Sequence, residues 1–135
     1  MQNECEVRIE RLWVDERTQR CRLELRTRDR TRALWLPIGI VEAALCERLE
    51  PSDGGSDPLA LAHAALQASG VVIEAGRLAA LPDGALRGEL TLRAADGTRR
   101  RVHGRAIDVT LLCARAGATL HAPASRLVAA GDVSD

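Results

Sequence analysis

Two stretches of this chain carry the same succession of strand and helix signals, 67 residues apart. Residues 33–46 read ALWLPIGIVEAALC and residues 100–113 read RRVHGRAIDVTLLC. Upstream, VRIE at residues 7–10 matches VVIE at 71–74, EL at 24–25 matches EL at 89–90, and DRTR at 29–32 matches DGTR at 96–99. We predict a duplicated strand-strand-strand-helix unit, with halves at about residues 5–50 and 71–123 and a mobile linker over 51–57. Chance similarity in a chain rich in Arg, Ala and Leu is the alternative.

The end of the second unit has the clearest local pattern. One apolar stripe with helical spacing runs through Val109, Leu112, Cys113 and Ala116. Gly117 follows it, at a position where a left-handed residue ends a helix at low cost. The spacing predicts a helix that has Asp108 in its first turn and ends just before Gly117, followed by a strand over 118–121.

The rest of the chain predicts further strands and two more helices. Strands are expected at residues 5–14, with a bulge near Arg11, and at 21–28, 33–38, 71–74, 86–93 and 99–104. Helices are expected at 40–49 and at 58–68, the second capped by Asp57 and largely covered. The expected fold is α+β in a single domain over residues 1–135: a mixed, mostly antiparallel sheet or half-barrel with helices packed on it.

Composition limits the classes of function. The chain has 19 basic and 19 acidic residues, so no overall charge favours nucleic acid or membrane. Trp13 and Trp35 are the two aromatic residues, and we expect both to be buried. Four cysteines form no CxxC pair, and no secretory signal or membrane-length apolar run is found. We expect a cytoplasmic protein with reduced thiols and no membrane partner.

An ordered set of short motifs resembles the bifunctional nuclease domain family. The set comprises Leu36-Pro37-Ile38-Gly39 with Glu42-Ala43, a Pro58-Leu59 helix ending at Gly70, Arg105-x-x-Asp108, and Arg115-x-Gly117-Ala118. The resemblance spans roughly residues 5–123. It implies a compact α+β domain of repeated strand-rich units that cleaves RNA and DNA with a divalent metal, and it places Arg105, Asp108 and Glu42 at polar positions of the family.

The sequence departs from the family pattern at three places. The Trp that follows Leu-Pro-Ile in the family is missing, and Ala106-Ile107 replace Pro-Ser between Arg105 and Asp108. The second helix of the family opens with Thr-His-Asp, where this chain has Pro58, Leu59 and Ala60. If those polar residues carry the chemistry, this copy has lost it.

Glu42 and Asp108 are the candidate metal-binding and catalytic acids. Both stand near the start of equivalent helices, so a duplicated fold could bring them together to hold Mg²⁺ or Mn²⁺, with Arg105 as a phosphate clamp. His103 is the best candidate general base. The alternatives are that each acid only stabilises its helix start, that Asp108 and Arg105 pair to fix a corner, and that His103 is simply exposed.

Two groups of arginines are candidate nucleic-acid contacts. Arg26, Arg28, Arg30 and Arg32 share a strand face and turn, and Arg99, Arg100 and Arg101 occupy the matching place in the second half. Such patches would bind phosphates in a salt-dependent way. Acidic residues lie among them, so ordinary solvated strand faces are the alternative.

Two functions follow from these observations. The first is weak metal-dependent cleavage of RNA or DNA. The second is a catalytically degenerate member of the same fold that acts as a homo-oligomeric binding or partner-interaction module. The missing Thr-His-Asp element favours the second function, whereas the resemblance over nearly the whole chain favours the first.

Overall fold

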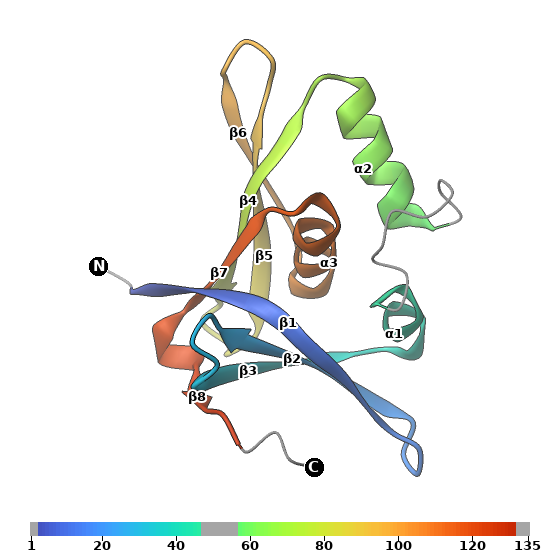
Figure 1. Cartoon of the computed structure of the whole chain (residues 1–135), viewed down its shortest axis with the longest axis vertical. Coiled ribbons are helices and arrows are strands. Elements are labelled where there is room, and N and C mark those ends of the chain that lie inside the picture. Colours follow the sequence, from blue (N-terminus) through green and yellow to red (C-terminus); the bar gives the residue numbers. More distant parts are fainter. Residues whose placement is uncertain (1–2, 47–56, 132–135) are drawn as a thin grey trace.

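The computed structural model describes residues 3–46 and 57–131, and it forms one eight-stranded sheet with three α-helices (Figure 1). The strands are β1 (Glu4–Asp15), β2 (Arg20–Thr27), β3 (Arg32–Ile38), β4 (Val72–Ala80), β5 (Leu86–Arg93), β6 (Arg99–Arg105), β7 (Thr119–Pro123) and β8 (Val128–Ala129). The helices are α1 (Ile40–Cys46), α2 (Pro58–Ala68) and α3 (Ala106–Ala116), and a 3₁₀ turn follows at Ala124–Arg126.

The sheet joins two antiparallel meanders through one strand. Its order is β6-β5-β4-β7-β1-β2-β3-β8, so each half of the chain contributes three adjacent strands. Strand β7 lies between the halves, antiparallel to β1 and parallel to β4. The sheet is mixed, mostly antiparallel and open, with β6 and β8 at its edges, which confirms the predicted α+β class; it does not close into a barrel.

The two halves share local features at the positions that the sequence repeat predicted. The ladder register shifts between Ile9 and Arg11 in β1 and between Ile73 and Ala75 in β4, so Glu10 and Glu74 are both bulge residues. The register also refines the alignment. Ile9 pairs with Leu25 and Ile73 with Leu92, so Leu92 rather than Leu90 corresponds to Leu25.

The turns of the two meanders also match. The Asp29 side chain accepts a hydrogen bond from the Thr31 backbone N–H (3.0 Å), and Asp96 accepts one from the Thr98 N–H (2.9 Å). The residue after each aspartate, Arg30 or Gly97, has a positive φ of 64° or 87°. These correspondences support the predicted repeat.

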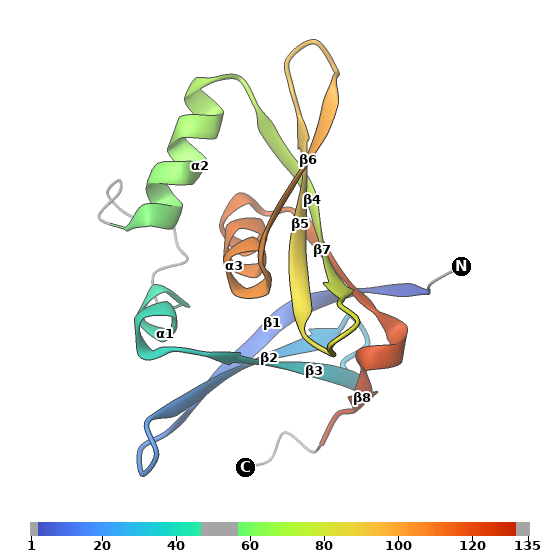
Figure 2. The ribbon, with the colours of Figure 1, turned by 180° about the vertical axis from the view of Figure 1, so that it is seen from behind.

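Helix α3 and the sheet face beneath it form the core. The largest fully buried apolar side chains are Leu23, Leu25, Leu78, Leu111 and Val7. Helix α3 packs on β4 and β5, as the view from behind also shows (Figure 2). Its close approach depends on Gly88, where an added Cβ would lie 2.5 Å from Val109 Cγ2 and 2.9 Å from the Arg105 carbonyl oxygen.

Most of the expected elements are confirmed. Helix α2 has its predicted bounds, and α3 has Asp108 in its first turn and ends before Gly117 as predicted. Asp57 caps α2 by accepting from the Ala60 N–H (2.8 Å). The first helix is described to Cys46, so the predicted residues 47–49 lie outside the described part of the chain, as do linker residues 51–56.

Two burial predictions were wrong, and the alternating charged residues of β2 are not solvated. Glu24 and Arg26 are 1% and 4% exposed. Helix α2 is not largely covered, since Leu59 is its one buried residue and Leu61 is 67% exposed. Trp13 and Trp35 are half-buried and lie on the face of the sheet opposite α3. In each case the sequence pattern indicated which side of the element a residue is on, but contacts with other parts of the chain decided whether that side is buried.

Candidate functional site at the start of helix α3

Arg105 stands at the corner where β6 becomes α3. It is the N-cap residue, with an extended backbone (φ −66°, ψ 145°), and its side chain makes no capping hydrogen bond to the helix. The guanidinium instead turns to Asp108 in the first helical turn. Nε donates to Oδ2 at 2.9 Å and Nη2 donates to Oδ1 at 3.0 Å, which is a two-pronged pair.

Helix α1 brings Glu42 to the same guanidinium. Glu42 is the third residue of α1 and Asp108 the third residue of α3. Arg105 Nη1 donates to Glu42 Oε1 at 3.2 Å. The structure therefore brings together Glu42, Asp108 and Arg105 from the two halves of the chain, with the arginine between the two acids.

The electrostatics of this trio are those of an exposed ion-pair cluster. The hydrogen bonds that Arg105 donates to Asp108, followed by the negative charge of Asp108 and the interactions with Glu42, raise the pKa of Arg105. The Arg105 side chain is 64% exposed, so water and salt screen the pairs strongly and their contribution to stability is small. The predicted pairing of Arg105 with Asp108 is observed, and Glu42 joins it.

A groove runs beside the trio between the two halves of the chain. Its volume is about 660 Å³, and it extends along β3 from Trp35 to Gly39, with the β4–β5 turn and the start of α3 on its other sides. Glu42, Arg105 and Arg126 are its charged lining residues. Arg87 lies directly opposite Arg105 in the β5–β6 ladder, so three arginines, Arg87, Arg105 and Arg126, stand near the two acids Glu42 and Asp108. The groove combines an apolar wall with exposed guanidinium groups.

The two acids are a poor metal site in this arrangement. Mg²⁺ and Mn²⁺ prefer several oxygen ligands around one point. Glu42 and Asp108 supply carboxylate oxygens, but the Arg105 guanidinium lies between them, and a cation would have to displace it. Within residues 3–46 and 57–131, no group of three or more His, Cys, Asp or Glu side chains gathers in a geometry that could hold a metal.

His103 lies two residues before Arg105 in β6 and faces the outer side of the sheet. Its side chain is 50% exposed, and Nδ1 is 3.8 Å from Oε2 of Glu89 on β5. The described contacts give it no hydrogen bond to Glu42 or Asp108. The structure thus places this candidate base beside the trio, next to a different carboxylate.

The candidate basic residues do not form one continuous patch. Arg99 pairs with Glu74 (2.8 Å) and Arg101 with Glu89 (3.8 Å), while Arg100 points to the other face of β6. Arg28 and Arg30 lie in the β2–β3 turn, where Arg30 pairs with Glu10 (2.7 Å). Strands β5, β4, β7 and β1 separate the two groups. The two groups of arginines therefore lie on separate parts of the surface, and carboxylates pair with arginines in each group.

No family model matches this chain, and no curated protein matches it. The described residues contain no helix with the length and apolar character needed to cross a bilayer.

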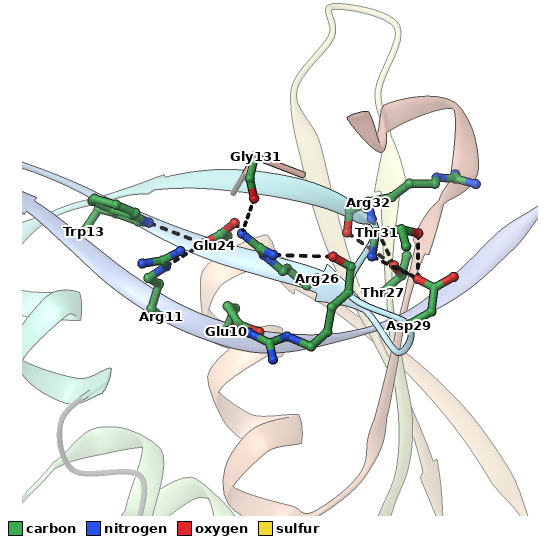
Figure 3. A network of polar contacts seen from close by, with 11 residues as sticks. Glu10, Arg11, Trp13, Glu24, Arg26, Thr27, Asp29, Thr31, Arg32 and Gly131 are labelled. Atoms are coloured by element: carbon green, nitrogen blue, oxygen red, sulfur yellow. Dashed lines mark hydrogen bonds and ion pairs between the residues drawn. The ribbon is translucent and has the colours of Figure 1, made fainter. Parts of the chain in front are cut away.

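A polar cluster that was not predicted from the sequence surrounds Glu24 on the outer face of β1 and β2 (Figure 3). The Glu24 carboxylate accepts from Arg26 Nε (2.8 Å), Arg11 Nε (3.0 Å) and Trp13 Nε1 (3.3 Å). Burial acts to raise the pKa of Glu24, but these three hydrogen bonds outweigh it and lower the pKa. The available signal was the predicted bulge, which places Arg11 and Trp13 on the same face as Glu24.

Proposed function

We propose that this chain is a divergent, catalytically degenerate relative of the bifunctional nuclease domain family that binds RNA or DNA at the groove beside Arg105. The observation that supports the loss of catalysis is that the Arg105 guanidinium donates hydrogen bonds to both candidate carboxylates, Glu42 and Asp108. Metal-dependent phosphodiester hydrolysis needs carboxylate oxygens that are free to hold the ion. Here three of the four carboxylate oxygens, both of Asp108 and Oε1 of Glu42, already accept from Arg105.

The same geometry supports contact with phosphate. A guanidinium has five N–H groups, and the three hydrogen bonds to Asp108 and Glu42 use one each on Nε, Nη1 and Nη2. One N–H on each of Nη1 and Nη2 remains, a pair suited to two phosphate oxygens. Arg126 and Arg87 nearby add positive charge.

Weak Mg²⁺- or Mn²⁺-dependent cleavage is the second candidate. The observation in its favour is that Glu42 and Asp108 meet at one point from two different helices, as a two-carboxylate site requires. Displacement of Arg105 would expose both carboxylates to a cation. His103 is the nearest histidine along the strand, although it faces Glu89.

The test measures binding and cleavage of labelled RNA and DNA by the wild type, Arg105→Gln and a control, Arg17→Gln, in the β1–β2 turn. We expect binding that weakens with salt, and we expect Arg105→Gln to reduce affinity and to lower the salt slope for single strands by about 0.7. Binding without salt dependence, or unchanged by Arg105→Gln, would contradict the proposal.

Cleavage is measured with chelator, Mg²⁺ or Mn²⁺. We expect no metal-stimulated cleavage by the wild type. If the wild type cleaves and both Glu42→Gln and Asp108→Asn abolish the cleavage, the protein is instead a metal-dependent nuclease. Glu42 and Asp108 would then be catalytic.

A further inference from the structure

The outer face of β1, β2 and β3 carries both tryptophans of the chain between two arginines. The Trp13 and Trp35 ring centroids are 6.0 Å apart, with ring planes tilted by 55°. The Arg11 guanidinium lies 4.5 Å from the centre of the Trp13 ring, and the Arg22 guanidinium lies 4.6 Å from that of Trp35. Both tryptophans are partly exposed, so the row Arg11-Trp13-Trp35-Arg22 is a surface feature.

The Arg11 end of this row is fixed. Arg11 donates to the buried Glu24, and the Trp13 indole N–H donates to the same carboxylate oxygen. The Arg26 guanidinium holds the other oxygen and also donates to the Gly131 carbonyl oxygen at 3.2 Å. The Trp13 ring therefore keeps its position and its stacked cation.

The Arg22 end is not fixed in the same way. Arg22 is exposed, and its one recorded side-chain partner among the described residues is the ring of Trp35. An exposed cation on an aromatic face is held only weakly, because water competes for it. Another flat group can therefore replace the Arg22 guanidinium on Trp35 at little cost, which leaves that cation free to contact an anion.

This surface continues into the groove beside Arg105. A second hollow, lined by Trp13, Arg20 and Arg22, shares Pro37 and Ile38 with that groove. Asp15 and Glu16 also line the second hollow. The path from one hollow to the other thus passes two aromatic rings, with guanidinium groups at both ends.

We propose that Trp13 and Trp35 form a stacking surface for single-stranded nucleic acid, with a base on Trp35 in the place of the Arg22 guanidinium. Arg22 then turns to the neighbouring phosphate, and the strand continues toward Arg126 and Arg105. The proposal rests on the proposed function and specifies its ligand as single-stranded. Duplex bases are already stacked on each other, so their faces are not available to tryptophan.

The two hollows are lined by four arginines against three acids, Asp15, Glu16 and Glu42, and this excess of cations favours a nucleic acid over a proline-rich peptide, which also docks on exposed aromatic rings. A neutral peptide has no negative charge to pair with Arg20, Arg22 and Arg126, whereas the phosphates of a nucleic acid can pair with them. The tilt of the two rings allows a base to stack on one ring and excludes a base inserted flat between them.

Intrinsic fluorescence tests the proposal directly, because the chain has two Trp and no Tyr, so all aromatic emission comes from this surface. The full chain is titrated with a single-stranded thymidine homopolymer, a uridine homopolymer, a duplex of equal length and a proline-rich peptide. We expect the single strands to quench the emission and the duplex and peptide to leave it unchanged.

Substitutions assign the effect to residues. Base–aromatic stacking predicts that Trp35→Ala weakens single-strand binding by roughly 5- to 100-fold, whereas Trp35→Phe, which keeps a ring, loses much less. Arg22→Gln should weaken binding and lower the salt slope by about 0.7. Thermal melts of each variant verify the fold, and Trp35→Phe keeps the test valid if Trp35→Ala does not fold.

The outcomes separate the two proposals. If single strands bind and Arg105→Gln weakens them, but neither quenching nor a Trp35 effect is seen, the stacking surface is wrong and the proposed function stands. If no nucleic acid binds, both are wrong. Quenching by the proline-rich peptide alone would identify a protein-binding surface and overturn the inference.

Discussion

Glu10 and Glu74 occupy the same place in the two halves of the chain. Each is the extra residue of a β-bulge in the first strand of its half. Each accepts a hydrogen bond from an arginine at or just after the second hairpin turn of its half, Arg30 in the β2–β3 turn at 2.7 Å or Arg99 at the start of β6 at 2.8 Å. The repeated bulge matters because it reverses which residues face the core in the remainder of the strand.

Glu24→Gln should destabilise the fold by roughly 3–5 kcal/mol, the usual effect of removing one partner of a buried pair. The reason is that Arg26, 4% exposed, would lose the carboxylate that neutralises it. Chemical denaturation measures the change, with Glu16→Gln in the exposed β1–β2 turn as the control. Equal stability of the two variants would show that the buried cluster contributes nothing.

The pH dependence of stability should report the same cluster. The folded protein holds the pKa of Glu24 below its ordinary value of 4.5, so the folded state binds fewer protons than the unfolded state. The stabilisation is complete above that value and is lost as pH falls through the lower, folded pKa. We expect a steeper loss of stability below about pH 4.5 in the wild type than in Glu24→Gln.

Gly88→Ala should destabilise the protein by about 3 kcal/mol or more, because the new methyl group would press on Val109 and on the Arg105 carbonyl. Gly104 lies directly opposite in the ladder and is the matched control, since a Cβ there would be 4.0 Å from Val109 Cγ2, an ordinary contact. Thermal melts of both variants measure the difference. Similar melting temperatures would mean that α3 does not approach β5 as closely as described.

The Asp29 carboxyl should titrate at a pKa of about 2 in nuclear magnetic resonance spectra. The Thr27 hydroxyl, the Thr31 backbone N–H and the Thr31 hydroxyl all donate to it and stabilise the ionised form. Thr27→Val removes the largest of these effects and should raise the pKa, whereas the pKa of Asp96 in the equivalent turn should not change. An unaltered Asp29 pKa in the variant would exclude the hydroxyl as the cause.

Asp57→Ala should destabilise the protein more than Asp57→Asn, by roughly 1 kcal/mol. Both variants remove the charge that faces Arg115 Nη2 at 3.2 Å, but asparagine keeps an oxygen that can accept the Ala60 N–H. Chemical denaturation gives the difference between the two variants. Equal stabilities would show that the cap of α2 is dispensable.

The sequence by itself determined the features that depend on near neighbours. Alternation in residues 21–27 and 86–93 located β2 and β5, the 3.6-residue period located α3, and Gly117 marked the end of that helix in the left-handed conformation. These signals are local because each arises within one strand or one turn of helix. The bulge near Arg11 was visible for the same reason, as a break in alternation.

The candidate site was predictable only in part. The repeat indicated that Glu42 and Asp108 stand at equivalent helix starts, and the motif singled out Arg105. The sequence left open whether Arg105 would bind phosphate or the acids, and the structure shows it donating to both. That choice depends on how α1 and α3 approach each other across the chain, which no local pattern encodes.

Only the tertiary structure decided what the polar residues of β2 face. The sequence shows Glu24 and Arg26 as alternating charged positions typical of a solvated strand, yet both are buried. Their burial depends on Arg11 and Trp13 from β1 and on the Gly131 backbone. Periodicity fixes the side of the sheet to which a side chain points, but long-range pairing of strands determines whether water or another part of the chain meets it there.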